Sequence, residues 1–330
     1  MLNARLFALA IAISWAPIQV CAQAPARNAN SKAATWKVPR LPDGHPDLEG
    51  YWTNNTATPL QRPDGAGEFL TDEQIKALES RGGQPAPNRN NPFPTLWRGD
   101  ARYVMRRSSI ITDPKDGKIP PLTPVGKQRL EALQEEHKRN YHAGPEDMTL
   151  LERCITWISS GPPMLPTFYN NNYQIIQTPD HVSILTEMVH DVRIIPVDGR
   201  PHEDIPQYMG DERGHWEGDT LIVETTHFNG KRGWFGLAQF NGDDLKRPDE
   251  NMRVIERFTR TAPDVLLYQF TVDDPFIYTR PWSGEVAMQQ FEGPILEYAC
   301  HEANQSLELI LGGARADEKA AAEAAQKKPQ

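Results

Sequence analysis

The chain has 330 residues, of which 38% are hydrophobic and 24% are charged, so it is long enough to bury a full core. Its formal net charge is -9 and its pI is near 5.5. These values argue against nucleic acid and anionic lipid as partners, because both require a basic surface. The 29 prolines and 23 glycines are too many for a helical bundle and fit short strands joined by turns.

The first 22 residues have the features of an export signal. Arg5 supplies a positive charge, residues 6–15 form a short apolar run, and residues 20–22 form a small-residue cleavage site. The apolar run is too short to span a bilayer, and no later segment replaces it. We therefore expect no membrane insertion and a location in the periplasm or outside the cell.

The part of the chain after the signal is expected to form one domain. Residues 23–40 are rich in Ala, Asn and Pro and predict a flexible tether. A single β-rich domain follows over residues 41–315, with a helical insert at residues 71–138. Residues 316–330 are expected to form a solvated or disordered tail.

Capping signals mark two helices in the insert. Thr71 and Gln74 form a capping box at the start of the first helix. Thr123 followed by Pro124 starts the second helix, because proline is favoured at the first helical position. A third, short helix is expected near the C-terminus, at residues 304–311.

Alternation of apolar and polar residues predicts antiparallel strands from Tyr173 onward. A strand is expected at residues 220–228, and hairpins are expected at residues 173–188, from residue 190 across the Asp198–Gly199 turn, and at residues 252–273 and 287–300. Such a meander closes into a barrel or folds into a sandwich in order to hide its edges. The expected fold class is therefore mainly β, as a barrel or a sandwich.

One short string favours the barrel. Gly50-Tyr51-Trp52 has the Gly-x-Trp form that opens the first strand of lipocalin-like proteins, which the chain resembles at this point. The resemblance implies a calycin-like barrel. In that family the tryptophan packs under an arginine from the end of the barrel, so the resemblance implies Arg315 or Arg257 in this role.

Two cysteines, Cys154 and Cys300, remain after cleavage of the signal. In an oxidising compartment such a pair predicts a disulfide. Closing this loop contributes about 4–5 kcal/mol in the chain-entropy model. The alternative is a metal site, because His301 and Glu302 follow Cys300 directly, but the chain lacks the Cys-x-x-Cys pair typical of thiolate zinc sites.

Carboxylates stand among apolar neighbours in two of the predicted strands. Glu224 shares a face with Ile222, and Glu256 shares a face with Val254. If both faces point inward, the barrel holds an apolar cavity that contains acids and suits a small molecule. In the alternative interpretation each glutamate lies on a solvated face or pairs with a neighbouring arginine.

The segment from Glu187 to Arg193 is the richest in polar chemistry. With period-two alternation, Glu187, Asp191 and Arg193 share one face, while His190 lies on the opposite, apolar face. His190 is therefore expected to be buried. If a bulge shifts the register, His190 instead joins the acids.

The Asp198–Gly199 turn decides how the next segment pairs. Pairing across this turn puts Arg193 opposite Asp204, an ion pair that needs no substrate. In the alternative, Asp191, Arg193 and His202 converge on one face. A histidine held by an acid is the arrangement that acid–base catalysis near neutral pH requires.

Several strings resemble, together, a family of secreted bacterial proteins. They are PDGxPDLxGxW from Pro42, HDVR from His190, WEGDTL from Trp216, ERFTR from Glu256, and YACHExN from Tyr298 leading to GAR at Gly313. The match covers nearly the whole chain after the signal, which implies a single domain. The resemblance implies no particular activity.

These patterns predict an exported enzyme that uses histidine and carboxylate acid–base chemistry, as a lyase, isomerase or hydrolase, on a partly apolar organic molecule. The candidate catalytic residues are His190, His202, Asp191 and Glu187. The candidate substrate-binding residues are Arg193, Glu224, Glu256, Trp216, Arg280, Trp282, His301 and Glu302.

Two alternatives stay open. The first is a carrier or sensor without catalysis, in which the same groups anchor a ligand. The second is a metal-assisted hydrolase with zinc held by His190, His202, Glu187 or His301. The sequence has no Gly-x-Ser-x-Gly, no phosphate loop and no dinucleotide fingerprint, so no nucleotide cofactor is expected.

Overall fold

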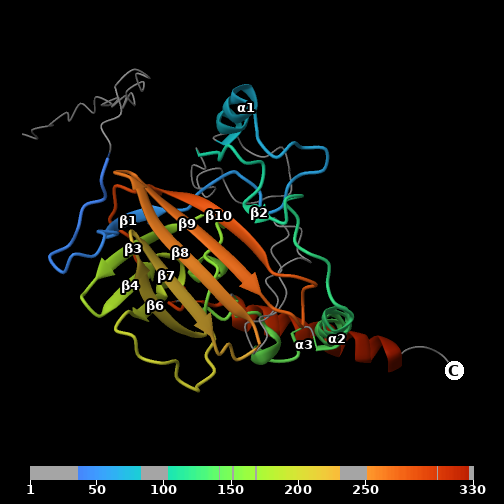
Figure 1. Cartoon of the computed structure of the whole chain (residues 1–330). Coiled ribbons are helices and arrows are strands. Elements are labelled where there is room, and N and C mark those ends of the chain that lie inside the picture. The colour runs from blue at the N-terminus through green and yellow to red at the C-terminus, as the bar shows by residue number, and fades with distance from the viewer. Residues whose placement is uncertain are drawn as a thin grey trace, which may run out of the picture. The chain divides into compact units, whose positions relative to one another are not determined.

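Antiparallel strands dominate the computed structural model of the protein (Figure 1). The structure describes residues 36–82, 103–140, 142–150, 152–167, 169–230, 251–302 and 304–326. The chain divides into two units, residues 1–36 and residues 37–330, and the helices and strands that the structure describes belong to the second unit. The predicted export signal and the first part of the tether lie outside the described residues.

Helices interrupt the strands in the first half of the chain, and most of the strands follow one another in the second half. The strands are β1 (Gly50–Thr53), β2 (Ile111–Asp113), β3 (Asn172–Gln177), β4 (His181–Thr186), β5 (Val192–Pro196), β6 (Asp211–Glu217), β7 (Thr220–Thr226), β8 (Arg253–Ala262), β9 (Val265–Asp273) and β10 (Trp282–Gln290). The α-helices are α1 (Asp72–Gly82), α2 (Pro124–Asn140) and α3 (Ser306–Gln326). Short 3-10 helices cover Pro145–Asp147, Ile158–Ser160 and Met188–His190.

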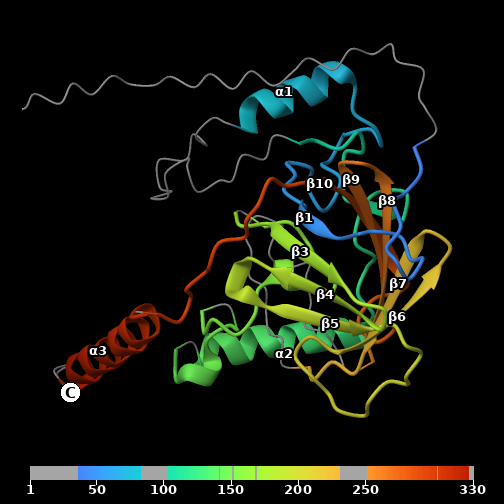
Figure 2. The same ribbon diagram turned by 90° about the vertical axis from the view of Figure 1, so that its left-hand side faces the viewer.

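Nine strands form a nearly closed antiparallel barrel, which confirms the predicted fold class. Their order is β5-β4-β3-β1-β10-β9-β8-β7-β6. The short strand β2 is not part of this order and pairs with β10. The two ends of the order, β5 and β6, lie side by side (Figure 2). In the described part of the chain these two strands share no backbone ladder, so the barrel has a seam between them.

Alternation along β9 shows how the sequence selects the inner face of the barrel. Leu266, Tyr268, Phe270 and Val272 are buried, and the residues between them are only partly buried. Burying each of these large side chains contributes roughly 1.5–3 kcal/mol. In the neighbouring strands too, every second side chain points inward, and these side chains form one shared core.

Trp52 in β1 packs under an arginine, as the lipocalin-like string implied, but the arginine is a different one. The guanidinium carbon of Arg260 lies 5.3 Å from the centroid of the Trp52 ring, within cation–π distance. The expectation of Arg257 or Arg315 was wrong. Arg257 has the opposite parity on β8 and faces outward toward Glu217, and Arg315 belongs to α3.

The capping signals of the two predicted helices in the insert are confirmed. The backbone N–H of Gln74 donates to Thr71 Oγ1 at 3.3 Å, and the backbone N–H of Thr71 donates to Gln74 Oε1 at 2.8 Å. Gly126 N–H donates to Thr123 Oγ1 at 2.9 Å at the start of α2. The C-terminal helix α3 runs farther than predicted, to Gln326.

The helices were also compared with the length and hydrophobicity of membrane-spanning segments. Among the described residues, no helix combines the length and the apolar character needed to cross a bilayer.

Three of the predicted strand segments are confirmed and two hairpins are wrong. The confirmed segments are β3–β4, β8–β9 and β7. No strand follows the Asp198–Gly199 turn directly, because β5 ends at Pro196 and the next strand starts at Asp211. Likewise β10 ends at Gln290, already paired with β9 and β1, and residues 291–300 add no strand.

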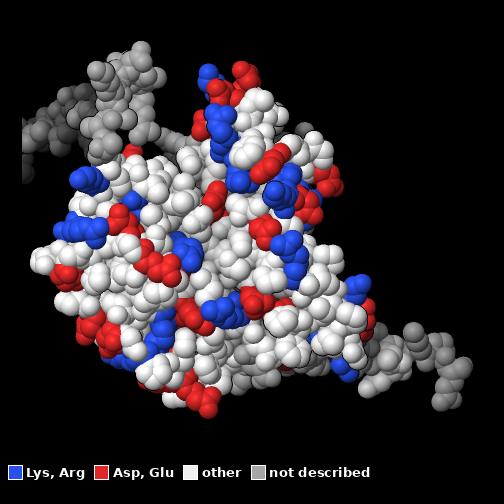
Figure 3. Space-filling model, in the orientation of Figure 1, with Lys and Arg blue, Asp and Glu red and all other residues white. Residues whose placement is uncertain are grey.

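Charges of both signs alternate over one face of the molecule. Figure 3 shows acidic and basic side chains interspersed there without one large patch of either sign. Among the ion pairs of exposed side chains are Arg253 with Glu224 at 2.7 Å and Arg257 with Glu217 at 3.2 Å. Such exposed pairs contribute little to stability, typically about 0–1 kcal/mol each.

Candidate functional site

The structure distributes the predicted site residues over several separate places. Two lie inside the barrel, several lie around the disulfide, and one lies in the loop before β6; the rest lie in the core or on the outer surface. Inside the barrel are Arg193 and Glu256; near the disulfide are His190, His301 and Glu302; close to His190 in the chain are Glu187 and Asp191; in the loop is His202.

The barrel interior contains a cluster of one cation and two carboxylates. Arg193 in β5 donates through Nε to Glu212 Oε1 at 2.7 Å and through Nη1 to Glu256 Oε1 at 3.0 Å. A second bond joins Arg193 Nη2 to Glu256 Oε2, so this pair is bidentate. The exposed fractions of the side chains of Arg193, Glu212 and Glu256 are 1%, 6% and 0%.

The electrostatics of this cluster keep the arginine charged. Burial would lower the pKa of Arg193, but the two carboxylates together raise it well above its usual value. Burial raises the pKa of Glu212, and the Arg193 guanidinium opposes that shift. Tyr268 also donates to Glu256 Oε1 at 2.8 Å. The arginine and tyrosine bonds pair the charges of this cluster, so the fold explains it without a ligand, although Glu212 Oε2 is buried with no hydrogen-bond partner among the described residues.

The cluster also corrects two predictions. Arg193 does not pair with Asp204, whose side chain is fully exposed, because residues 197–210 form a loop rather than a paired strand. Glu224 does not share the interior with Glu256. The inward positions of β7 include Leu221 and Val223, so Glu224 faces outward and pairs with an arginine there.

Close approach of β5 and β6 places Arg193 against Glu212 across the seam of the barrel. A Cβ atom added to Gly214 in β6 would lie 2.8 Å from Val197 Cγ1 and 2.9 Å from Ile195 Cγ2. Only a residue without a side chain fits this position without moving its neighbours. The buried ion pairs therefore close the barrel where the backbone ladder is missing.

Three predicted aromatic or basic residues lie away from these clusters. Trp282 is in the core, where its ring meets Phe270 edge-to-face at 5.6 Å between centroids. The ring of Trp216 stacks on His45 at 5.0 Å. Arg280 forms an ion pair with a carboxylate on the surface.

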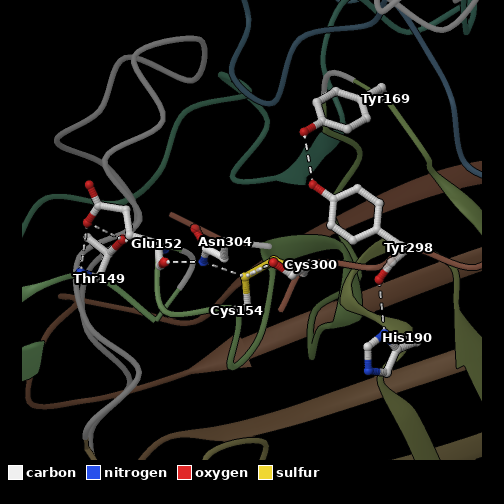
Figure 4. The surroundings of a disulfide bond; sticks show 8 residues. All are labelled: Thr149, Glu152, Cys154, Tyr169, His190, Tyr298, Cys300 and Asn304. Atoms are coloured by element: carbon white, nitrogen blue, oxygen red, sulfur yellow. Dashed lines mark hydrogen bonds between the residues drawn. A yellow bond between two sulfur atoms is a disulfide. The ribbon is translucent and has the colours of Figure 1, made fainter. Parts of the chain in front are cut away.

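The Cys154–Cys300 disulfide is confirmed, with a Cα–Cα distance of 5.7 Å (Figure 4). It joins the loop after α2 to the segment between β10 and α3. A groove of about 390 Å³ lies beside it. The residues that line this groove are Glu152, Cys154, Tyr298, Ala299, Cys300, Glu302, Asn304 and Ser306.

His190 is held at this groove through one of its lining residues. The Nδ1 atom of His190 lies 3.1 Å from the backbone carbonyl oxygen of Tyr298. A carbonyl oxygen only accepts, so Nδ1 carries the hydrogen, and in the neutral ring Nε2 is left as the acceptor. Figure 4 shows the dashed contacts running from Tyr169 through Tyr298 to His190, with the disulfide beside them.

The expectation that His190 is buried was wrong, because a 3-10 turn breaks the period-two pattern. His190 is exposed, and both Val189 and His190 have left-handed backbone conformations, with φ of 61° and 47°. A valine in that region is a steric outlier, since its branched side chain crowds the backbone. Such conformations cost about 1–3 kcal/mol each and are concentrated at functional sites.

The two acids close to His190 in sequence, Glu187 and Asp191, are bound by other groups. Glu187 is buried and accepts from Asn172 Nδ2 at 2.5 Å. Asp191 accepts from Thr156 Oγ1 at 2.9 Å and from Ser160 Oγ at 2.7 Å. These bonds hold the turn that carries His190. Both acids therefore help to position the backbone of His190, and they do not bond to its ring in these contacts.

Tyr298, which lines the groove, contacts a second tyrosine, Tyr169. The hydroxyl groups of Tyr169 and Tyr298 lie 3.2 Å apart. Burial, followed by the bond with Tyr298, raises the pKa of Tyr169, so that this phenol stays protonated at neutral pH. His301 and Glu302 are exposed next to the disulfide.

His202 belongs to a different cluster, at the open end of the β6–β7 hairpin. His202 Nδ1 lies 2.7 Å from Asp211 Oδ2, and the rings of His202 and His227 are 5.7 Å apart. Among the described residues, one ligand atom from each of His202, Asp211 and His227 lies within 4.8 Å of the others. The grouping expected for zinc, which joined His202 to His190, Glu187 or His301, does not appear in this cluster.

The sequence analysis did not identify Asp211 and His227 as site residues, although the turn between β6 and β7 could have indicated them. The two-residue turn at Gly218–Asp219 sets the register of the β6–β7 hairpin, in which Asp211 is paired with Thr226. His227 follows directly on Thr226. Counting outward from that turn would therefore have brought Asp211 and His227 to the same end of the hairpin.

Comparison of the sequence with known protein families found no matching family model, and comparison with curated proteins found no match.

Proposed function

We propose that the protein is an exported enzyme that acts on a small organic molecule in the groove beside the Cys154–Cys300 disulfide. His190 accepts a proton from the bound molecule and returns it, as in a lyase, isomerase or hydrolase. The observation that carries this proposal is the bond between His190 Nδ1 and the backbone of Tyr298, which itself lines the groove.

The geometry of His190 suits proton transfer. Its Nδ1 is occupied by the carbonyl oxygen, which fixes the tautomer and leaves Nε2 as the proton acceptor. The strained turn at residues 189–190 holds the ring in place. The disulfide restrains the segment that carries Tyr298, and a hydrogen bond joins His190 to that lining residue of the groove.

The lining of the groove favours a molecule with several hydrogen-bonding groups. Glu152 and Glu302 contribute carboxylates, Asn304 contributes an amide, and Tyr298 contributes a phenol. A volume of about 390 Å³ is within the usual range for small-molecule sites. The predicted export signal and the disulfide both support an oxidising compartment outside the cytoplasm.

A screen for ligands, followed by a test for turnover, checks this proposal. Purified protein is screened against a library of small organic acids, esters and lactones by ligand-observed NMR, and each hit is incubated with protein and followed by mass spectrometry. His190→Gln keeps a polar side chain of similar reach but cannot relay a proton. We expect it to retain ligand binding and to lower turnover by about 100-fold or more.

His215→Gln is the matched control, since His215 is an exposed histidine on β6 that contacts Glu217. It is expected to behave as the wild type in binding and turnover. Circular dichroism and thermal unfolding establish that both variants are folded. Unchanged turnover in folded His190→Gln would refute the catalytic role, and ligands that bind in the groove without any turnover would indicate a carrier instead.

A further inference from the structure

The cluster of His202, Asp211 and His227 is built by three segments that meet at one end of the β6–β7 hairpin. Asp211 is the first residue of β6 and pairs in register with Thr226, the last residue of β7. His227 is the next residue along the chain. The loop between β5 and β6 brings His202 over the same end of the hairpin, where it meets Asp211.

Gly210 allows this loop to approach the hairpin. Its φ is +76°, and an added Cβ atom would lie 2.6 Å from the backbone oxygen of Thr226. The loop also bonds to the end of β7, where Gln207 N–H donates to the His227 carbonyl oxygen at 2.9 Å. The backbone on both sides of the cluster is therefore fixed before any ligand binds.

The carboxylate of Asp211 is oriented by groups outside the cluster. Arg213 Nη1 donates to Asp211 Oδ1 at 2.7 Å, and the backbone N–H of Glu203 donates to Oδ2 at 3.0 Å. Hydrogen bonds of this kind to a ligating carboxylate are the usual outer shell of a metal site. Thr226 Oγ1 plays a similar part for His227, whose Nδ1 lies 2.8 Å away.

The cluster is open on one side. The side chain of Asp211 is 8% exposed, whereas those of His202 and His227 are 24% and 33% exposed. Three protein ligands with access to solvent leave a coordination position for water or for a ligand group, which is the pattern of catalytic rather than structural zinc sites.

The backbone of His227 gives a second, independent sign of a functional site. Its φ is 57°, in the left-handed region that non-glycine residues rarely adopt. This conformation costs about 1–3 kcal/mol and is retained where the surroundings enforce it. A further carboxylate, Asp204 Oδ1, lies 3.9 Å from His227 Nε2 and adds negative charge near the cluster.

We infer that His202, Asp211 and His227 form a binding site for one divalent transition-metal ion, with zinc as the foremost candidate. Two imidazoles and one carboxylate suit zinc and the neighbouring transition metals, whereas calcium and magnesium prefer all-oxygen sites. When bound, such an ion supplies a Lewis acid at its open position. This inference is independent of the groove and of His190.

Titration of the protein with zinc tests the site. The full-length protein is purified without a histidine tag, stripped with a chelator and titrated with zinc chloride by isothermal calorimetry, and in parallel with cobalt chloride by visible absorption. We expect one equivalent of each ion to bind, with absorption bands that indicate nitrogen and oxygen ligands. Zinc is also expected to raise the midpoint of thermal unfolding, because it binds the folded form.

His227→Asn is the main variant, because asparagine tolerates the left-handed backbone and so preserves the fold. It and His202→Ala are each expected to weaken zinc binding by about 100-fold or more, since loss of an outer-shell partner alone costs roughly 10–100-fold. His215→Ala and His190→Gln are controls that are expected to bind zinc as the wild type does.

Three outcomes would overturn the inference. They are the absence of saturable zinc binding by the stripped protein, unchanged affinity in folded His227→Asn, and an equal loss of affinity in His215→Ala, which would indicate adventitious binding at surface histidines. Because the turnover test depends on His190 and the groove, failure of either proposal leaves the other intact.

Discussion

Asp211 and Glu212 are neighbours in sequence at the start of β6, yet they belong to two clusters of opposite character. Glu212 points into the barrel, where it and Glu256 share the Arg193 guanidinium. Asp211 lies at the end of the hairpin with two histidines that are partly exposed. Because successive residues of a strand point to opposite faces, a single step along the chain separates the two environments.

The difference between the clusters lies in how their charges are satisfied. Inside the barrel, one arginine forms ion pairs with two carboxylates, and all three side chains are buried. At the end of the hairpin, the side chains of two histidines are partly exposed, although each Nδ1 atom bonds to a protein group, Asp211 for His202 and Thr226 for His227. Buried charges that satisfy each other support the fold, whereas converging polar groups that stay accessible are suited to binding a ligand.

The largest effect is expected when the cation of the interior cluster is removed. Arg193→Met keeps the length of the side chain but leaves Glu212 and Glu256 buried without a positive partner. We expect the free energy of unfolding, measured by urea denaturation, to fall by about 3–5 kcal/mol. Arg253→Met, which removes the exposed pair with Glu224, is the control and is expected to cost about 0–1 kcal/mol.

A similar small loss in both arginine variants would show that the interior ion pairs do not close the barrel. The same measurement on a variant that combines Arg193→Met with Glu212→Gln and Glu256→Gln separates unpaired charge from lost packing. If unpaired charge is the cause, this triple variant recovers part of the lost stability.

Exchanging the two neighbouring acids for amides tests the separation of their roles. Asp211→Asn removes the carboxylate of the proposed metal site and is expected to weaken zinc binding by about 100-fold. Glu212→Gln, one residue away on the opposite face, is expected to leave zinc affinity within about 3-fold of the wild type. Isothermal calorimetry on the chelator-stripped proteins measures both, and equal losses would contradict two distinct clusters.

The smallest effect is expected from a change at the seam itself. Gly214→Val places a branched side chain against Val197 and Ile195, so β5 and β6 must move apart. Overpacking of this kind typically costs about 1–3 kcal/mol. Gly312→Ala in α3, where an added Cβ meets nothing within 4 Å, is the control and is expected to be neutral or slightly stabilising. Equal stability of both variants would show that β5 and β6 are not tightly apposed.

Much of the barrel followed from local patterns. The hairpins β3–β4 and β8–β9 were predictable because a run of alternating apolar residues, a turn and a second run lie next to one another in sequence. The helix caps at Thr71 and Thr123 were predictable for the same reason. The disulfide was predictable from compartment and cysteine count, without any knowledge of the path between the two residues.

Several of the predictions that failed concern parity or long-range partners. His190 is exposed because a 3-10 turn shifts the alternation after β4, and Glu224 faces outward because its strand begins on the other parity. The arginine over Trp52 is Arg260 rather than Arg257 for the same reason. A shift of one residue moves a side chain to the opposite face of a sheet, so small errors in register change every assignment downstream.

By itself, the sequence determined that the chain builds antiparallel strands, caps its helices and joins Cys154 to Cys300, since each depends on a residue and its near neighbours or on composition. Only the tertiary structure decided that β5 meets β6, that Arg193 is enclosed by Glu212 and Glu256, and that His202 meets Asp211 and His227. These contacts form only when the barrel closes. Closure brings together segments that are far apart in sequence, and their separation along the chain does not predict how close they lie in space.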